Sequence, residues 1–240
     1  MSLPGADREG LPLPVFPGLS RTGAGCRTLV GRAHRTVPTE QREEPDEDPR
    51  HRRHRNRLRP CRTPARQLAS SGHQLVALVR DPSKADLPAG ITIVKGDLTD
   101  ASAVRRALDC TDWAFLNMAD DNGAVFAEAA VEAGLGHTVL LSSFTAVTEL
   151  PSGPANIITA RHQAGERALA QAGVPSTFLR AAGFDYNILM WVASAADGVV
   201  RAPNADVKLP VVDPADIASA AVAVLTAADP KPGAYSITGP

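Results

Sequence analysis

Short apolar runs recur along the second part of the chain, and each is bounded by Gly, Pro or charged residues. These runs predict strands at 75–78, 91–94, 113–116, 138–143, 176–180 and 235–238. Helices are predicted between them, at 101–108 after the cap Asp100, at 124–133, at 158–172 and at 213–227. Residues 66–73 have the pattern of the last turns of a helix ended by a glycine. Strands alternating with helices of this length predict an α/β fold with a doubly wound parallel sheet.

The first part of the chain shows neither the two-residue period of a strand nor the 3.6-residue period of a helix. Residues 1–66 mix Pro, Gly, Arg and Glu, and an acidic patch at 43–48 abuts a basic run at 50–57. This composition predicts a disordered segment. The basic run could instead contact nucleic acid, but no aromatic residue interleaves it to stack on bases, so we expect no nucleic-acid partner. We therefore divide the chain into residues 1–66, disordered or out of frame, and a folded domain at 67–240.

The genetic code offers a further interpretation of this segment. Back-translating residues 46–56 and reading one nucleotide forward permits the product M-K-I-L-V-T-G-A-T-G-T. This product would be a start methionine, a buried strand and the Gly-rich turn of a dinucleotide site. We hypothesise that the N-terminal third is translated from a shifted frame, with the proper frame regained near Arg66.

Composition narrows the class of protein further. The chain has 240 residues and a formal net charge of −1, which gives no overall attraction to nucleic acid or to a membrane surface. No apolar stretch approaches the roughly 20 residues that a membrane span needs. Cys26, Cys61 and Cys110 form neither a disulfide pattern nor a zinc pattern. We therefore expect a cytoplasmic protein in a reducing compartment.

Charged residues follow two of the predicted strands. Arg80 comes directly after the apolar run 75–78, and Asp97 follows the next run. Ligands of parallel α/β sheets bind at the carboxyl ends of strands. An Arg at such a position can meet a ribose or its 2′-phosphate, and the Asp can meet an adenine. This stretch therefore predicts a nucleotide-binding sheet.

Residues 67–240 resemble the NmrA-like branch of the atypical short-chain dehydrogenase/reductases. The resemblance rests on SSGHQLVALVRDPSKADLPAGITIVKGDLTD, VEAGLGHTVLLSS, RHQAGERALAQAGVPSTFLRAAGFDYNIL, DGVVRAP, VVDPADIASAAVAVL and YSITGP. It implies a Rossmann-like fold that binds NAD(P)(H). Some members of the family reduce quinones, azo dyes or other small acceptors, and others sense the nucleotide and bind regulatory proteins.

The sequence departs from this family in two places. The first strand and its G-x-x-G-x-x-G turn, whose backbone N–H groups approach the pyrophosphate, are expected to be missing. The chain also ends at Pro240, where the family continues into C-terminal helices, so we expect an incomplete substrate region.

The resemblance assigns residues to the adenosine half of the cofactor. Arg80 matches the position that contacts the 2′-phosphate of NADP, with Lys84 as a helper, and this favours NADP(H) over NAD(H). Asp97 and Leu98 match the contacts to adenine. Each position also has a purely structural interpretation, as an exposed turn residue or a helix-entry turn.

Other residues match the nicotinamide half. Leu116 and Asn117 end the strand that passes the nicotinamide ribose in the family, and Ser142 lies where related enzymes place a catalytic Ser. Arg180 and Phe184 match the turn that flanks the nicotinamide. The structural alternatives are an ordinary strand end, a hydroxyl that bonds to backbone groups in a turn, and a core aromatic.

The Tyr-x-x-x-Lys pair of related reductases is missing, because no Tyr precedes Tyr186 and no Lys precedes Lys208 after the predicted strand 138–143. His162 and Glu166 are four residues apart and share one helix face. His162 is the candidate to bind ribose or to donate a proton, and Tyr186 is a second candidate proton donor. Glu166 is expected to support the helix or Arg180. We see no metal-ligand cluster in the sequence.

Two functions remain open from these residues. The first is a reductase that moves a hydride from NADPH to a small, flat electrophilic acceptor of the quinone or azo type. The alternative is a non-catalytic NAD(P) sensor that regulates a protein partner. Turnover of NADPH with such an acceptor distinguishes them.

Overall fold

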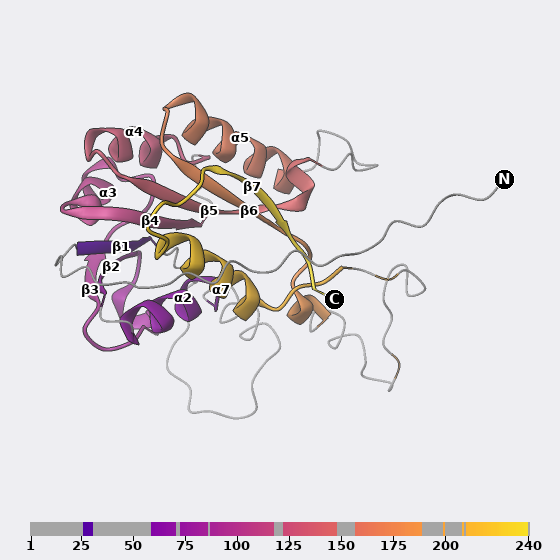
Figure 1. Cartoon of the computed structure of the whole chain (residues 1–240). Helices are drawn as coiled ribbons and strands as arrows, with labels where there is room; N and C mark the ends of the chain where they lie inside the picture. Colours follow the sequence, from indigo (N-terminus) through magenta and orange to yellow (C-terminus); the bar gives the residue numbers. More distant parts are fainter. Residues whose placement is uncertain are drawn as a thin grey trace.

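The computed structural model describes residues 26–30, 59–70, 73–85, 87–117, 122–147, 157–188, 199, 208 and 210–239. Within these ranges the strands form one seven-stranded sheet in the order β3-β2-β1-β4-β5-β6-β7 (Figure 1). Every pairing between neighbours is parallel. The strands are β1 (Cys26–Val30), β2 (Gln74–Val79), β3 (Thr92–Lys95), β4 (Thr111–Asn117), β5 (His137–Ser143), β6 (Ser176–Ala181) and β7 (Gly233–Ile237). The prediction of a doubly wound parallel sheet is confirmed.

Helices cover both faces of the sheet. On one face lie α3 (Ala101–Leu108), α4 (Ala124–Glu132) and α5 (Ile157–Gln171), and on the other lie α2 (Arg59–Ser70) and α7 (Pro214–Leu225) (Figure 1). The described residues also form the short 3-10 helices η1 (Pro82–Lys84), η2 (Phe144–Ala146) and η4 (Asp185–Ile188). The Asp100 carboxylate accepts hydrogen bonds from the Ser102 and Ala103 N–H groups and caps α3. Asp213 caps α7 in the same way, so both predicted caps are confirmed.

The strands are apolar on both sides because both faces of the sheet are covered. In β4, Ala114 and Leu116 belong to the core beneath α3, α4 and α5. Their neighbours Trp113 and Phe115 belong to the core on the side of α2 and α7. Successive strand residues point to opposite faces, so one short apolar run contributes to two cores. This explains why the runs read as continuous rather than alternating.

Two elements precede residue 67, where the sequence predicted none. Strand β1 lies between β2 and β4, with Thr28 opposite Val76 and Leu29 opposite Phe115. The expectation that the first strand is missing is therefore wrong. β1 has only five residues, CRTLV, and although glycines flank it, its apolar run of Leu29 and Val30 is too short to mark a strand. Its place is determined by hydrogen bonds to strands on both sides, which a local pattern does not reveal.

The sequence predicted only the last turns of the helix before β2. The whole helix begins at Arg59, and it contains Pro64. A proline normally argues against a helix interior, which is why the sequence pattern did not indicate the earlier turns. Ala65 and Leu68 are fully buried in the core shared with α7. Burial of this apolar face stabilises the helix in spite of its polar composition.

The predicted absence of the Gly-rich turn and the frame-shift hypothesis concern residues outside the described part of the chain. The segment that follows β1 begins Gly31-Arg32-Ala33-His34-Arg35, which does not contain G-x-x-G-x-x-G. Both interpretations stay predictions.

Candidate functional site

The carboxyl ends of all strands meet at one edge of the sheet, because the strands are parallel. Arg80 follows β2, Asp97 follows β3, Asn117 ends β4 and Ser142 lies near the end of β5. Arg180 lies near the end of β6. Residues that the sequence distributes over a hundred positions therefore share one edge, where α/β proteins bind nucleotides.

Arg80 and Asp97 form an ion pair at the end of this edge. The Arg80 Nε lies 3.5 Å from the Asp97 Oδ2, and the two side chains are 23% and 29% exposed. The other oxygen of Asp97 accepts hydrogen bonds from the Thr99 N–H and hydroxyl at 3.0 and 3.1 Å, which orients the carboxylate. The Gly96 N–H donates to the Val79 carbonyl at 2.9 Å and ties the end of β3 to β2. The pair presents a guanidinium and a carboxylate together, the groups predicted for the 2′-phosphate and the adenine.

The other candidates on the first strands, two for the adenosine half and two for the nicotinamide ribose, have different surroundings. The side chain of Leu98 is 3% exposed and belongs to the core, which leaves its backbone for a contact with a base. Leu116 is 1% exposed and also packs in the core, whereas Asn117 is half-buried at the strand end. Lys84 ends η1, and its side chain lies outside the described part of the structure.

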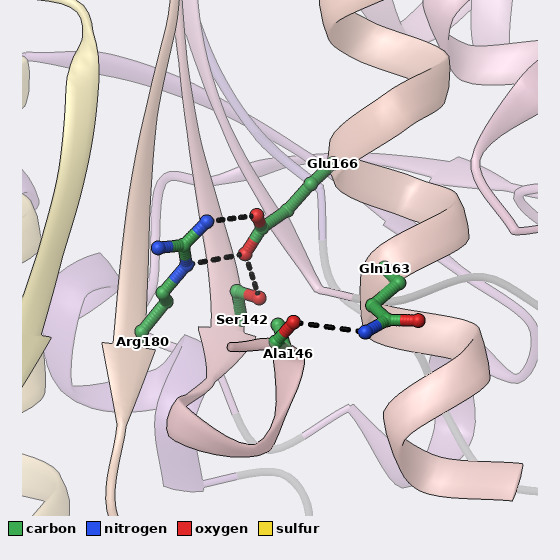
Figure 2. Close-up of polar contacts among 5 residues, drawn as sticks. All are labelled: Ser142, Ala146, Gln163, Glu166 and Arg180. Atoms are coloured by element: carbon green, nitrogen blue, oxygen red, sulfur yellow. Dashed lines mark hydrogen bonds and ion pairs between the residues drawn. The ribbon is translucent and has the colours of Figure 1, made fainter. Parts of the chain in front are cut away.

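Three side chains from separate elements meet near the ends of β5 and β6 (Figure 2). The Ser142 hydroxyl donates to the Glu166 Oε1 at 2.6 Å. Arg180 donates from Nε to Oε1 at 3.0 Å and from Nη2 to Oε2 at 2.6 Å, which makes the pair bidentate. The hydrogen bond to Glu166 raises the pKa of Arg180, so this guanidinium stays charged. The predicted support of Arg180 by Glu166 is confirmed, and we call these three residues the Ser-Glu-Arg cluster.

The cluster changes the interpretation of Ser142. Its side chain is buried, and its proton is engaged by a carboxylate. The sequence offered a catalytic hydroxyl or a hydroxyl bonded to backbone in a turn, and the structure shows a third arrangement. The turn after β5 is instead formed by Ser143, whose oxygen accepts from the Thr145 N–H at 3.3 Å.

His162 lies on α5, half-buried, one turn before Glu166. Its Nδ1 is buried and has no hydrogen-bond partner among the described residues. Burial lowers the pKa of His162, Arg161 lowers it further, and Glu166 acts in the opposite direction. The imidazole is therefore neutral at pH 7, and its buried Nδ1 is bonded to none of the described groups.

Phe184 and Tyr186 lie on the segment after β6. Phe184 forms an isolated parallel bridge with Val212 and packs against the core beneath α2 and α7, which favours the core-aromatic interpretation. Tyr186 is in η4, but its side chain lies outside the described part of the structure. The structure therefore gives no relation between this phenol and His162.

Sequence reasoning missed one residue beside His162. Gln163 donates from Nε2 to the Ala146 carbonyl at 2.9 Å and joins α5 to η2 (Figure 2). No local signal indicates this contact, because its partner is a backbone carbonyl of a distant turn. In the described residues, no group of three or more His, Cys, Asp or Glu side chains could hold a metal ion. None of the described helices is long and apolar enough to cross a membrane.

Residues 62–228 match the sequence profile of a family described as NAD(P)H-binding. The chain belongs to this NAD(P)H-binding family. The match covers most of α2, the strands from β2 to β6 and α7, and it includes Arg80, Asp97 and the Ser-Glu-Arg cluster. A dinucleotide ligand at the carboxyl edge agrees with the family and with the residues found there.

Named relatives agree with this membership. The chain is 37% identical over 182 residues to a (4-alkanoyl-5-oxo-2,5-dihydrofuran-3-yl)methyl phosphate reductase of Streptomyces griseus, an alignment that covers 73% of this chain and 63% of the relative. The structure of an NADPH-dependent quinone oxidoreductase of Escherichia coli, complexed with NADPH, is similar with a TM-score of 0.64 and 26% identity. This likeness covers 74% of this chain and 65% of the other. The chain thus spans less than two-thirds of the length of these relatives.

The fold is also shared with Nmra, a negative transcriptional regulator, with a TM-score of 0.62 and 20% identity over 75% of this chain and 63% of the regulator. The NAD(P)H-binding family and the Rossmann-like fold that the resemblance implied are confirmed, and the likeness to Nmra shows the fold.

Proposed function

We propose that this chain is an NADPH-dependent reductase that transfers a hydride to a small electrophilic acceptor of the quinone or azo type. The observation that carries the proposal is the Arg80–Asp97 pair at the carboxyl edge of a sheet that belongs to the NAD(P)H-binding family. The reductase names of the similar proteins support it. We also propose a cytoplasmic setting, with which an exposed thiol at Cys110 agrees.

The described residues fit the adenosine half of NADP(H). A guanidinium suits a 2′-phosphate in charge and in bidentate geometry, and the carboxylate of Asp97 suits the adenine amino group. An acidic residue in the place of Arg80 would have favoured the ribose hydroxyls of NAD(H), which we keep as the second cofactor. We assign no residue to the pyrophosphate, because the segment that follows β1 lies outside the described part of the chain.

When bound, NADPH supplies the hydride. Arg80 and Asp97 then hold the adenosine end, with Lys84 and the backbone of Leu98 beside them. We assign Leu116 and Asn117 to the ribose on the nicotinamide side.

We place His162 next to the nicotinamide, which is the reacting end of the cofactor. We assign Phe184 and Tyr186 to the same end. The neutral imidazole of His162 can bond to a ribose hydroxyl through Nδ1, and its protonated form can give a proton to the reduced acceptor. The lowered pKa makes the protonated form scarce at neutral pH. An acceptor whose reduced anion is stabilised by conjugation, such as a quinone, needs this proton least. The chemistry of the site therefore favours quinones over simple ketones.

The test is NADPH oxidation, followed by loss of its absorbance, with a water-soluble quinone, an azo dye and a simple ketone in parallel. We expect turnover with the quinone, slower turnover with NADH, and none with the ketone. Calorimetric binding of NADPH is measured on the same preparation. Absence of NADPH binding would overturn the proposal.

A second candidate is a non-catalytic nucleotide sensor with a protein partner. The observation that favours it is the absence of a Tyr-x-x-x-Lys pair between β5 and Lys208. NADPH binding without turnover of any acceptor would support the sensor.

A further inference from the structure

Two side chains that follow His162 along α5, those of Gln163 and Glu166, join the helix to other elements (Figure 2). Gln163, the next residue, donates to the Ala146 carbonyl in η2 at 2.9 Å. Glu166, one turn later, accepts from Ser142 on β5 and from Arg180 on β6. The helix segment that carries His162 is therefore bonded to three different elements at the carboxyl edge.

Burial makes the Glu166 contacts rigid. Glu166 is 8% exposed and Ser142 is 3% exposed, while the Arg180 side chain is 21% exposed. Oxygen Oε1 accepts two hydrogen bonds and Oε2 accepts one, so both carboxylate oxygens are engaged. A buried carboxylate that lost these donors would carry an uncompensated charge, which is strongly unfavourable. The carboxylate therefore has little freedom to move away from β5 and β6.

We propose that Glu166 is a positioning residue for His162. Bonded to β5 through Ser142 and to β6 through Arg180, it holds the turn of α5 that presents His162 at the carboxyl edge of the sheet. This inference rests on the proposed function, in which His162 is the group beside the nicotinamide.

The charges around His162 allow the inference to be tested without a cofactor. Arg161 and Glu166 are the charged groups that act on His162 among the described residues, and Arg180 is paired with Glu166. η2, which is tied to α5 by Gln163, contains only Phe, Thr and Ala. Neutralising Glu166 removes the group that favours the imidazolium and leaves Arg180 unbalanced. Both effects lower the pKa of His162, whereas exposure of the ring would raise it.

The experiment is an NMR titration of the histidine rings in the cofactor-free full chain, with His162→Gln used to assign the signal. In Glu166→Gln we expect the pKa of His162 to fall below its wild-type value while His137, at the opposite end of β5, keeps its own. Glu132→Gln is the matched control, because it also breaks an Arg–Glu pair, with Arg105, on the exposed surface of α3 and α4. This control should move neither histidine.

If Glu166→Gln does not fold, a second variant provides the test. Ser142→Ala keeps the carboxylate and its pair with Arg180 but removes one bond to Oε1. We expect it to shift the ring signals of His162 and to leave those of His137 in place. Signals of His162 that are unchanged in both variants would overturn the inference, whereas a rise in its pKa in Glu166→Gln would show that the ring becomes exposed once the cluster is broken. Because the titration needs no NADPH, a failure to bind NADPH would refute the proposed function without affecting this result.

Discussion

Replacing Arg80 by Gln should separate NADPH from NADH. The substitution removes the cation that we assign to the 2′-phosphate, a group that NADH lacks. Hydrogen bonds to charged groups are worth about 1.5–3 kcal/mol, so the dissociation constant for NADPH should rise by about 10-fold to about 150-fold. The dissociation constant for NADH should stay unchanged, because its adenosine ribose presents only hydroxyls.

The structure indicates that this change will not unfold the protein. The Arg80 and Asp97 side chains are 23% and 29% exposed and their atoms lie 3.5 Å apart, which is longer than a charge-assisted hydrogen bond. Ion pairs in such surroundings contribute at most about 1 kcal/mol to stability. The loss of NADPH affinity would therefore reflect the ligand contact rather than the fold.

The assay is isothermal titration calorimetry of both nucleotides on wild type, Arg80→Gln and the matched control Arg105→Gln. Arg105 pairs with Glu132 on the exposed surface of α3 and α4. We assign neither residue to the nucleotide, so the loss of Arg105 should alter neither affinity. An equal loss for NADPH and NADH, or an unchanged affinity for NADPH, would refute the assignment of Arg80 to the 2′-phosphate.

Three further predictions concern stability. His137 is buried at the start of β5, and burial lowers its pKa in the folded protein. The unfolded chain therefore binds more protons below about pH 6.5, and the free energy of unfolding should fall as the pH drops through that range. His137→Asn should flatten this pH dependence in urea titrations, and an unaltered slope would contradict the prediction. Gly96→Ala should lower the free energy of unfolding, measured by urea titration, by about 1–3 kcal/mol, because the new Cβ would lie 2.2 Å from the Ala103 Cβ. Gly183→Ala meets only ordinary contacts and serves as the control. Leu68→Ala should cost about 2–5 kcal/mol of unfolding free energy if α2 packs against α7, and a change within about 0.5 kcal/mol would show that it does not.

Local pattern was sufficient for the elements from β2 onward. Their strands are short apolar runs that end in Gly, Pro or charge, and two of their helices begin at Asp caps that satisfy free N–H groups. These are interactions between residues close in the chain, so the sequence records them directly. The placing of Arg80 and Asp97 at one edge followed from the same pattern, because consecutive parallel strands bring their carboxyl ends together.

Other features depended on contacts between distant residues. β1 has no signal of its own and is a strand because β2 and β4 hold hydrogen bonds to it on both sides. The engagement of the Ser142 proton by Glu166 needed β5, α5 and β6 to be packed together, and so did the burial that keeps His162 neutral. Residue types and spacing along the chain thus determined the fold class, the family resemblance and the candidates for nucleotide binding. Burial and hydrogen-bond partners, which arise only when separate elements pack, determined which of those side chains are core, which are positioning groups and which remain to meet a ligand.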